Sequence, residues 1–410
     1  MATTGNDAAA GTTDAPLRTV NRAAQLAIAG DVVTIRGGTY NESVVVRNSG
    51  TAAKPIVFQA EQRGTVVFSG GTHTFEGATW SGTVEPTGEF YVTLHGLIFR
   101  QYSDPLSTAN AIAAVRVSRG WVIDDVWFDE AGKTGVEIRY SDVVITHSTF
   151  NRNYTNAIVS WAPSSNAVGP SDPNFHPLTG IVIRDVIISG NNIDPSPAVG
   201  DAAEYVTKLW ATSGALIDNI ESYGNYGQGF WFDTDNTDFT IRNSYFHDNH
   251  PVPGSQDEAG KGLFLEVGWA PGLVERNVFR DNNGAGLAID NGAGIEVRDN
   301  LFIGNAQCIT LVNNDRGNNP NGQPRWPLRD IYMHDNQCKS WRDNAAIAGT
   351  YGNFQTPSAM GILADANVYD PLSNTALAEW PNIGVLRTLA DVRARLGWET
   401  NGRIGPVAVP

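Results

Sequence analysis

The sequence predicts an all-β solenoid of stacked parallel strands, because short alternating strands recur along it at a nearly constant spacing. Asn219 and Asn243 are 24 residues apart, and Asn277 and Asn300 are 23 apart. The intervening step of 34 residues contains an insertion at 251–260. Strands punctuated by Gly and Asn at such a period are typical of solenoids, in which each coil is one repeat.

Three segments of the repeat align residue for residue and end in an acid. They are 229–233, 262–266 and 286–290. In stacked coils their final residues, Asp233, Glu266 and Asp290, form one column with a rise of about 4.8 Å per coil. Like charges stacked in a sheet are destabilising, so a chain that keeps such a column is expected to use it.

Alternation within each strand assigns its side chains to the core or to the surface. In the first aligned segment Phe230 and Phe232 are predicted to point inward, and Trp231 and Asp233 outward. The same rule turns Glu266 outward. We expect the asparagines at the repeat position to form a structural ladder, since Asn tolerates left-handed turns and can bond its neighbour in the next coil.

A single domain, 1–410, is predicted, with an N-terminal cap at 1–30, coils at 31–345, and a C-terminal tail and cap at 346–410. The amphipathic segment after Thr19 predicts a short capping helix. A second helix is predicted to end at Gly397. Solenoids must cover both open ends of their core.

Charge and composition disfavour some partners. The net charge of −15 disfavours nucleic acid, and no 18-residue apolar run predicts a membrane span. No signal peptide is present, but the first residues look like a trimmed start, so we expect a secreted or periplasmic protein. A monomer and a homo-oligomer both stay open. Cys338 is expected in the core, and a disulfide with Cys308 is also left open.

Several segments resemble bacterial pectate-lyase-like proteins, which implies a single-stranded right-handed parallel β-helix with short capping helices at both ends. The segments are 4–12, 16–19, 30–35, 38–40 and 50–56. The resemblance covers nearly the whole chain. It implies the fold much more strongly than the function, because this fold hosts lyases, hydrolases, transferases and epimerases.

The segments 231–233 and 264–267 resemble the catalytic stretch of β-helical glycoside hydrolases, notably the β-xylosidase family with this fold. The resemblance implies that Asp233 is the nucleophile and Glu266 the acid/base. Spacing agrees, because one coil rise of about 4.8 Å suits the roughly 5–5.5 Å of retaining enzymes. Asp233 and Asp290, two rises apart, would suit inversion only marginally.

The neighbours of each acid suggest its role. Glu266 stands between two acids, so we expect its pKa to be raised as a general acid requires. Lys208, if its coil aligns, would keep Asp233 ionised. Asp290 would position Glu266 or bind a sugar hydroxyl. A solvated acidic face or a calcium site is the alternative interpretation of the column.

A poly- or oligosaccharide substrate is expected, and further residues are candidates to bind it. They are Trp231, Trp269, Trp210, Trp161, Asp235, Asn236 and His247. Each also has a structural interpretation, as packing, turn or loop residue. The insertion at 251–260 and the loop at 162–177 are expected to wall the cleft. No zinc-type ligand spacing is present, and the hydrolase interpretation needs no metal or other cofactor.

Other functions stay open beside the glycoside hydrolase that we predict. A polysaccharide lyase acting on a uronate polymer would use Lys208 as base, with calcium held by Asp233, Asp235 and Glu266. A fructan-converting or other glycosyl transferase would use the same acids. A non-catalytic glycan-binding solenoid would need no paired carboxylates.

Overall fold

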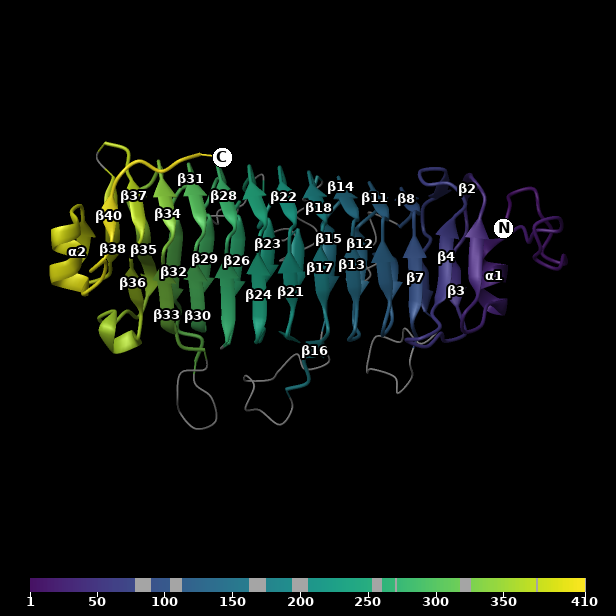
Figure 1. The fold of residues 1–410 in the computed structure, drawn as a ribbon, viewed down its shortest axis with the longest axis horizontal. Coiled ribbons are helices and arrows are strands. Elements are labelled where there is room, and N and C mark those ends of the chain that lie inside the picture. Colours follow the sequence, from purple (N-terminus) through teal and green to yellow (C-terminus); the bar gives the residue numbers. More distant parts are fainter. Residues whose placement is uncertain are drawn as a thin grey trace. The chain divides into compact units, whose positions relative to one another are not determined.

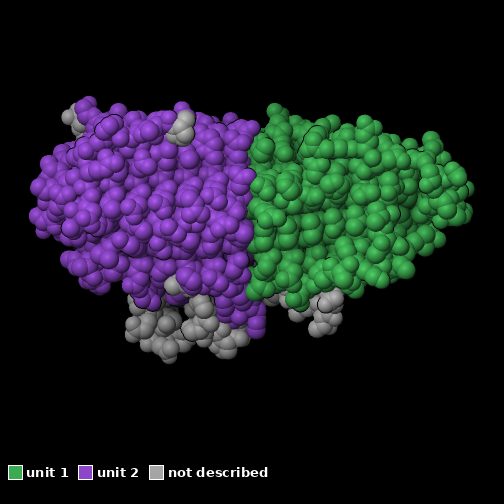
Figure 2. All heavy atoms as spheres, in the orientation of Figure 1, with its two compact units in different colours: residues 1–163, 178–203 green, residues 164–177, 204–410 purple. Residues whose placement is uncertain are grey.

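The computed structural model describes residues 1–77, 90–103, 113–161, 175–193, 206–252, 260–269, 271–317, 326–373 and 375–409. Regular structure in these residues is almost all strand, which confirms the predicted all-β class (Figure 1). Two compact units divide the chain, residues 1–163 with 178–203 (unit 1) and residues 164–177 with 204–410 (unit 2) (Figure 2).

Unit 1 consists of coils whose successive strands enter three parallel sheets in turn. The first sheet contains β1 (Val32–Ile35), β4 (Ile56–Ala60), β7 (Val92–His95), β10 (Val122–Asp124), β13 (Val144–Thr146) and β17 (Val182–Arg184). The second contains β2 (Gly38–Tyr40), β5 (Val66–Phe68), β8 (Ile98–Arg100), β11 (Trp127–Asp129), β14 (Thr149–Asn151) and β18 (Ile187–Ser189). The third contains β3 (Val44–Val46), β6 (Phe75–Gly77), β9 (Ala113–Val117), β12 (Thr134–Ile138) and β15 (Asn156–Ser160). β16 (Leu178–Thr179) lies outside these sheets.

Unit 2 repeats this plan. Its first sheet contains β21 (Leu216–Asp218), β24 (Phe239–Arg242), β27 (Gly272–Glu275), β30 (Ala293–Arg298), β33 (Arg329–His334) and β36 (Leu363–Asp365). The second contains β22 (Glu221–Tyr223), β25 (Tyr245–His247), β28 (Val278–Arg280), β31 (Leu301–Ile303), β34 (Gln337–Lys339), β37 (Val368–Asp370) and β40 (Arg403–Ile404). The third contains β19 (Thr207–Leu209), β23 (Phe230–Phe232), β26 (Leu263–Glu266), β29 (Leu287–Asp290), β32 (Ile309–Asn313), β35 (Ala345–Gly352), β38 (Ala376–Trp380) and β39 (Gly384–Leu386). β20 (Thr212–Ser213) is a separate short strand. The fold is the predicted right-handed parallel β-helix.

Inward side chains stack on their equivalents in the next coil, as the alternation predicted. In unit 2, Phe246, Phe279 and Phe302 stack with ring centroids 5.2 and 4.8 Å apart. Phe230 and Phe232 are likewise buried in the core. Buried aromatic pairs add to the stabilisation that comes from burial of apolar surface alone.

A buried asparagine ladder joins successive coils of unit 2 where the first sheet turns into the second. The amide Nδ2 of Asn277 donates to Oδ1 of Asn300 over 3.1 Å, and Asn300 donates to Asn336 over 3.0 Å. The Asn336 amide in turn donates to Asn367 over 3.1 Å. A ladder was predicted, and these residues confirm it.

The predicted ladder was wrong by one residue in the earlier coils, where Asn219 and Asn243 were assigned to it. The strand register pairs Arg242 with Glu275, so Ser244 stands opposite Asn277. Ser244 accepts a hydrogen bond from the backbone N–H of Ile220 and replaces the asparagine there. Asn219 and Asn243 instead occupy left-handed backbone positions, with φ of 54° and 53°. Such positions suit Asn for its backbone tolerance.

A second ladder, which the sequence interpretation missed, follows the second sheet. Asn225, Asn249, Asn282 and Asn305 donate from one amide to the next over 2.9–3.0 Å. Each lies five residues after the column of the first ladder, which is a periodic signal in the sequence. Two of the three turns of each coil in this region are therefore fixed by hydrogen bonds between buried side-chain amides.

Helices occur at both ends of the chain, as predicted. α1 (Val20–Leu26) starts at Thr19, whose hydroxyl accepts from the Arg22 N–H. α2 (Leu389–Leu396) ends at Gly397, which has a left-handed φ of 72°. A short 3₁₀ helix, η2 (Ser358–Met360), is the remaining helical element in the described residues. Neither α-helix is long and apolar enough to cross a membrane, and this holds for all residues that the structure describes.

The coils continue past residue 345, although the sequence predicted that they end there. β36 pairs with β33, β37 with β34, and β38 with β35. The asparagine ladder extends into this additional coil, where Asn367 accepts from the Asn336 amide. Glu399 then closes the ladder by accepting from the Asn367 amide over 2.7 Å and from the Tyr369 hydroxyl over 2.7 Å.

Both cysteines are buried free thiols, and Cys338 lies in the core as expected. Their pairing was left open by the sequence. In the structure they contribute as small apolar residues.

Replacement of a ladder asparagine tests the ladder. Asn277→Ala removes the acceptor of the Ser244 N–H and the donor to the Ile241 carbonyl. We expect the free energy of unfolding to fall by about 1–3 kcal/mol, since buried polar groups lose their partners. Chemical denaturation measures it. Asn283→Ala, at an exposed position beside the second ladder, is the matched control and should change stability little. Equal losses in both variants would contradict a role for the ladder.

Candidate active site

Three outward carboxylates lie at the ends of neighbouring strands in the third sheet of unit 2. Glu266 pairs in register with Asp290 across β26 and β29. Phe232 pairs with Leu265, so Asp233, the next residue of its strand, stands beside Glu266. The register therefore stacks the three acids on adjacent coils, as the aligned segments predicted, with a rise of about 4.8 Å between coils.

Asp233 forms an ion pair with Lys208, whose Nζ lies 2.5 Å from Oδ2. The sequence predicted that Lys208 would act on Asp233 if its coil aligned. The register pairs Lys208 with Trp231, and its long side chain reaches the carboxylate from there. The backbone N–H and hydroxyl of Thr234 donate to Oδ1 over 2.6 and 2.8 Å. Lys208 and Asp233 side chains are 12% and 11% exposed, so water screens the pair only weakly.

Arg316 joins the other two acids. One of its guanidinium nitrogens lies 2.5 Å from Glu266 Oε1 and 2.8 Å from Asp290 Oδ2. Asn314 donates to the same Asp290 oxygen over 3.0 Å. The second oxygen of Asp290, Oδ1, is buried and has no hydrogen-bond partner among the described residues. One cation is thus shared by two carboxylates, and Asp290 keeps an unused acceptor.

The surroundings raise the pKa of two of these acids. Burial, and then the charge of Asp233, raise the pKa of Glu266 to about 7, although Arg316 opposes the shift. Burial also raises the pKa of Asp290, again against the effect of Arg316. Glu266 therefore holds its proton near neutral pH, as its place between two acids predicted.

Asp235 and Asn236 are buried and serve the protein rather than a ligand, contrary to the expectation that they bind sugar hydroxyls. Asp235, 1% exposed, accepts from the indole N–H groups of Trp269 and Trp326 over 2.8 and 3.0 Å. Asn236 is fully buried, and its Oδ1 accepts from the backbone N–H and hydroxyl of Thr212. The turn after β23 uses both side chains to fix its surroundings.

The candidate tryptophans occupy different environments. Trp231 is 9% exposed and lies between Lys208, whose Nζ is 4.1 Å from its ring centroid, and Phe264, whose ring is 5.2 Å away. Trp210 is partly exposed, with Lys208 5.7 Å from its ring centroid. Trp269 is partly exposed beside Asp235. Trp161 belongs to unit 1, so it is not assigned to this site.

His247 lies on the second sheet, on β25, and not with the acids of the third sheet. Its ring stacks on Tyr245 with centroids 3.9 Å apart, and its nitrogens contact Asp248 and Glu221. The structure does not bring it together with the three acids, because strand β25 carries it to a different face of the coil.

The sequence interpretation missed Arg316, Asn314 and Trp326. The column residue after Asp290 is Val312, so the aligned acids end one coil before Asn314 and Arg316. The polar run 313–316, which begins at the last residue of β32, was the available signal. It lies at the same edge of the third sheet as the acids.

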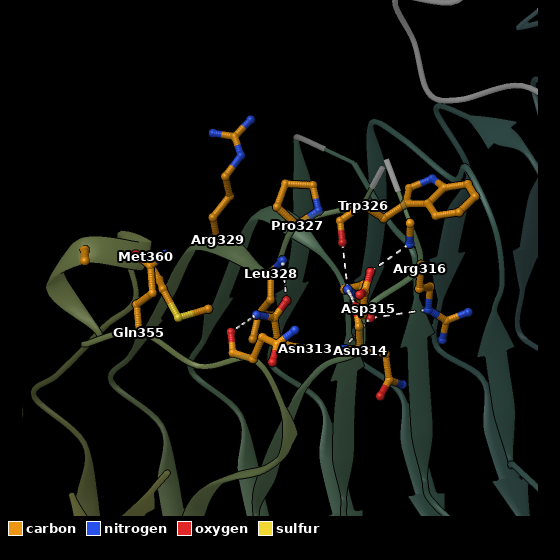
Figure 3. Close-up of a pocket in the computed structure, with 14 residues that line it drawn as sticks. Asn313, Asn314, Asp315, Arg316, Trp326, Pro327, Leu328, Arg329, Gln355 and Met360 are labelled. Atoms are coloured by element: carbon orange, nitrogen blue, oxygen red, sulfur yellow. Dashed lines mark hydrogen bonds between the residues drawn. The ribbon is translucent and has the colours of Figure 1, made fainter. Parts of the chain in front are cut away.

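A cavity of about 430 Å³ adjoins this group (Figure 3). Arg316 and Asn314 line it and also contact the acids. Trp326 lines it near Arg316, and Gln355 and Met360 lie across it. Its size falls within the range of small-ligand pockets.

The loops expected to wall the cleft fall largely outside the described residues, at 162–174 and 253–259. In the part of the chain that the structure describes, no three His, Cys, Asp or Glu side chains are grouped to hold a metal ion. The lyase alternative needs three calcium ligands, and each of them contacts a different partner: Asp233 contacts Lys208, Asp235 contacts Trp269 and Glu266 contacts Arg316. The structure does not assemble that particular arrangement.

The pKa of Glu266 makes stability depend on pH. Its pKa rises from 4.5 in the unfolded chain to about 7 in the fold, so its stabilising contribution is complete below about pH 4.5 and is lost as pH rises through 7. Glu266→Gln should therefore gain thermal stability over the parent between pH 5 and pH 8. Scanning calorimetry at several pH values measures it. Asp281→Asn, an exposed acid, is the control, and a Glu266→Gln difference independent of pH would contradict the shift.

Comparisons of sequence place the chain among known proteins. The family described as "Pel9A-like, right handed beta helix region" matches residues 1–324. The uncharacterized protein YwoF of Bacillus subtilis (strain 168) is 25% identical over 315 residues, 76% of this chain and 57% of YwoF. Pectate lyase PEL9 of Emericella nidulans is 41% identical over 68 residues, 16% of this chain and 17% of that protein. The matched region thus spans less than two thirds of either relative.

Comparisons of structure show the same fold. XylC, solved in complex with xylose, has a TM-score of 0.64 at 14% identity, over 92% of this chain and 85% of XylC. AlyGC, an alginate lyase of family PL6, has a TM-score of 0.52 at 14% identity, over 92% of this chain and 55% of AlyGC. Since the family match covers most of the sequence, the chain belongs to the Pel9A-like right-handed β-helix family.

Proposed function

We propose that the chain is a glycoside hydrolase that cleaves a poly- or oligosaccharide with retention, using Asp233 and Glu266. One observation carries the proposal. Two carboxyls stand on adjacent coils in different surroundings: burial and neighbouring charge raise the pKa of Glu266 to about 7, whereas Asp233 forms an ion pair with Lys208. Retaining glycosidases need such a pair, an acid beside a nucleophile at a separation of roughly 5–5.5 Å.

The residues can be assigned to a two-step mechanism. Asp233 attacks the anomeric carbon as Glu266 gives its proton to the departing glycosidic oxygen, and a glycosyl ester forms. Glu266, now a carboxylate, takes a proton from water, whose oxygen attacks the anomeric carbon and releases Asp233. Each residue returns to its starting protonation state, so the cycle closes without another reactant.

Arg316 and Asp290 hold Glu266 in place. The shared guanidinium fixes one oxygen of Glu266, which leaves the other for the substrate. Asp290 shares this guanidinium and so acts on Glu266 through Arg316. This fits the supporting role predicted for Asp290.

The compared proteins support a carbohydrate substrate. XylC binds xylose in its solved complex, AlyGC is an alginate lyase, and PEL9 is a pectate lyase. At 14% identity the solved structures share the fold with this chain, and the activity remains part of the proposal. Pectate-lyase-like proteins are typically extracellular, and we extend that location to this chain.

Lyase chemistry is the second candidate. The family relation and the PEL9 match favour β-elimination on a uronate polymer, with Lys208 as base. A base must be a free amine, whereas Lys208 is ion-paired with Asp233. We therefore rank hydrolysis first.

Substitution of the two acids tests the proposal. Asp233→Asn and Glu266→Gln should each lower kcat by about 100-fold or more, as loss of a nucleophile or general acid does. With an aryl glycoside whose leaving group needs no proton, Glu266→Gln should keep its glycosylation step while Asp233→Asn should not. New reducing ends and aryl release measure this.

A control variant and the products formed separate hydrolysis from elimination. Asp281→Asn, an exposed acid directly after β28 of the second sheet, should keep full activity. An unsaturated uronate absorbing in the ultraviolet, lost with EDTA and with Lys208→Ala, would reject hydrolysis and support elimination. Full activity of both acid variants on a competent substrate would reject the acid pair.

The pH–rate profile provides a further test. Activity should fall as pH rises through about 7, because Glu266 then loses the proton it donates. Arg316 lowers the pKa of Glu266, so Arg316→Gln should move this basic limb to higher pH. Profiles of kcat/KM for both proteins measure the shift. An unmoved or downward-shifted limb would show that another group controls it.

A further inference from the structure

The cavity beside the acids lies on their C-terminal side. The column that contains Glu266 and Asp290 continues in register to Val312 and then to Tyr351. Residues that follow Val312 and Tyr351 line the cavity, Asn313 to Gly317 from one coil and Asn353 and Gln355 from the next. The cavity thus extends the acid column by further coils along the same sheet.

The charged side chains that line the cavity already have partners. Arg316 contacts both acids, and Asp315 accepts from the backbone N–H of Gly317 over 2.9 Å. Arg329 pairs with Asp330 over 2.5 Å. Neither arginine that lines the cavity is therefore left without an ion pair, and the Asp315 carboxylate, which forms none among the described residues, would repel a uronate.

Amide groups remain for a ligand. The side chains of Asn353 and Gln355 are exposed and make no hydrogen bond among the described residues. Asn291, by contrast, uses its whole amide: it donates to the Asn314 and Trp326 carbonyls and accepts from the Asn314 N–H. Neutral donors and acceptors such as these match hydroxyl groups.

One aromatic side chain lines the cavity. Trp326 lines it, and the buried carboxylate of Asp235 fixes its indole N–H over 3.0 Å. Tyr351 is 70% exposed on the column that leads away from the acids. A rigid indole beside free amides is the kind of surface on which a sugar ring can stack while its hydroxyls are bonded.

We propose that this cavity is a second saccharide subsite, which holds a neutral sugar unit of the same chain on the C-terminal side of the bond cleaved at Glu266. The inference rests on the proposed function and names its substrate class, a neutral oligosaccharide rather than a uronate polymer. Trp326 supplies the stacking face, Gln355 and Asn353 bind hydroxyls, and Asp235 is a positioning residue for Trp326.

The subsite is tested by binding that needs no turnover. Glu266→Gln protein is titrated calorimetrically with neutral oligosaccharides of xylose, arabinose, galactose and glucose, and with oligogalacturonate. We expect one neutral series to bind more tightly as it lengthens. Adding Gln355→Ala with Asn353→Ala should weaken its binding about 10-fold, the effect of one to two lost hydrogen bonds. Adding Gln337→Ala, an exposed glutamine on the second sheet, should leave binding unchanged. Preferred binding of oligogalacturonate, or no effect of the cavity substitutions, would overturn the inference.

Turnover separates this inference from the proposed function. In the enzyme with intact acids, Gln355→Ala with Asn353→Ala should lower the ratio of kcat/KM for the oligosaccharide to that for an aryl monoglycoside about 10-fold. An unchanged ratio, with Glu266→Gln inactive, would reject the subsite alone. Retained activity of Glu266→Gln would reject the catalytic assignment, and the calorimetric result would still decide the subsite.

The position of Trp326 is tested through Asp235. Asp235→Asn should shift tryptophan emission and lower the same kcat/KM ratio, because the indole loses a charged acceptor. A general loss of stability would lower both rates together and leave their ratio unchanged, and that result would overturn the positioning role.

Discussion

Parallel stacking in register is the constraint on which this structure depends. Each coil repeats the backbone of the coil before it, so equivalent side chains stand about 4.8 Å apart. For phenylalanine and asparagine the repetition is favourable, since rings stack and amides bond in series. For Asp233, Glu266 and Asp290 it forces like charges together, and the surrounding cations must offset the repulsion.

Two cations do so unequally. Lys208 serves Asp233 alone, whereas Arg316 divides its charge between Glu266 and Asp290. The difference is geometric: lysine approaches from the coil before the column, and arginine returns from the coil after it. Glu266 is buried and shares its cation with Asp290. Its pKa is therefore higher than that of an exposed carboxyl, and it keeps its proton to a higher pH.

Much of this arrangement could be predicted from the sequence, because strand periodicity is visible in it. The aligned segments gave the register of the acids, and alternation gave their outward direction. The sequence did not predict that Ser244, rather than Asn243, occupies the ladder position, since serine and asparagine can accept from the same backbone N–H. Arg316 was missed because it lies on a loop, where the strand period does not predict which residues a long side chain will contact. Asp235 and Asn236 look like ordinary turn residues, and only packing shows that they are buried.

The end of the asparagine ladder has a consequence of its own. An asparagine side chain both accepts and donates a hydrogen bond, so each one in the ladder can bond another in the next coil. Glu399 accepts from Asn367 but, when ionised, has no N–H to pass on. The series of bonds therefore has a last member, set by one side chain. Beyond it, β38 pairs with the antiparallel β39. An open sheet edge invites a strand from a neighbouring molecule, and at the end of the third sheet that strand would meet β39, which runs against the direction of the stacked strands.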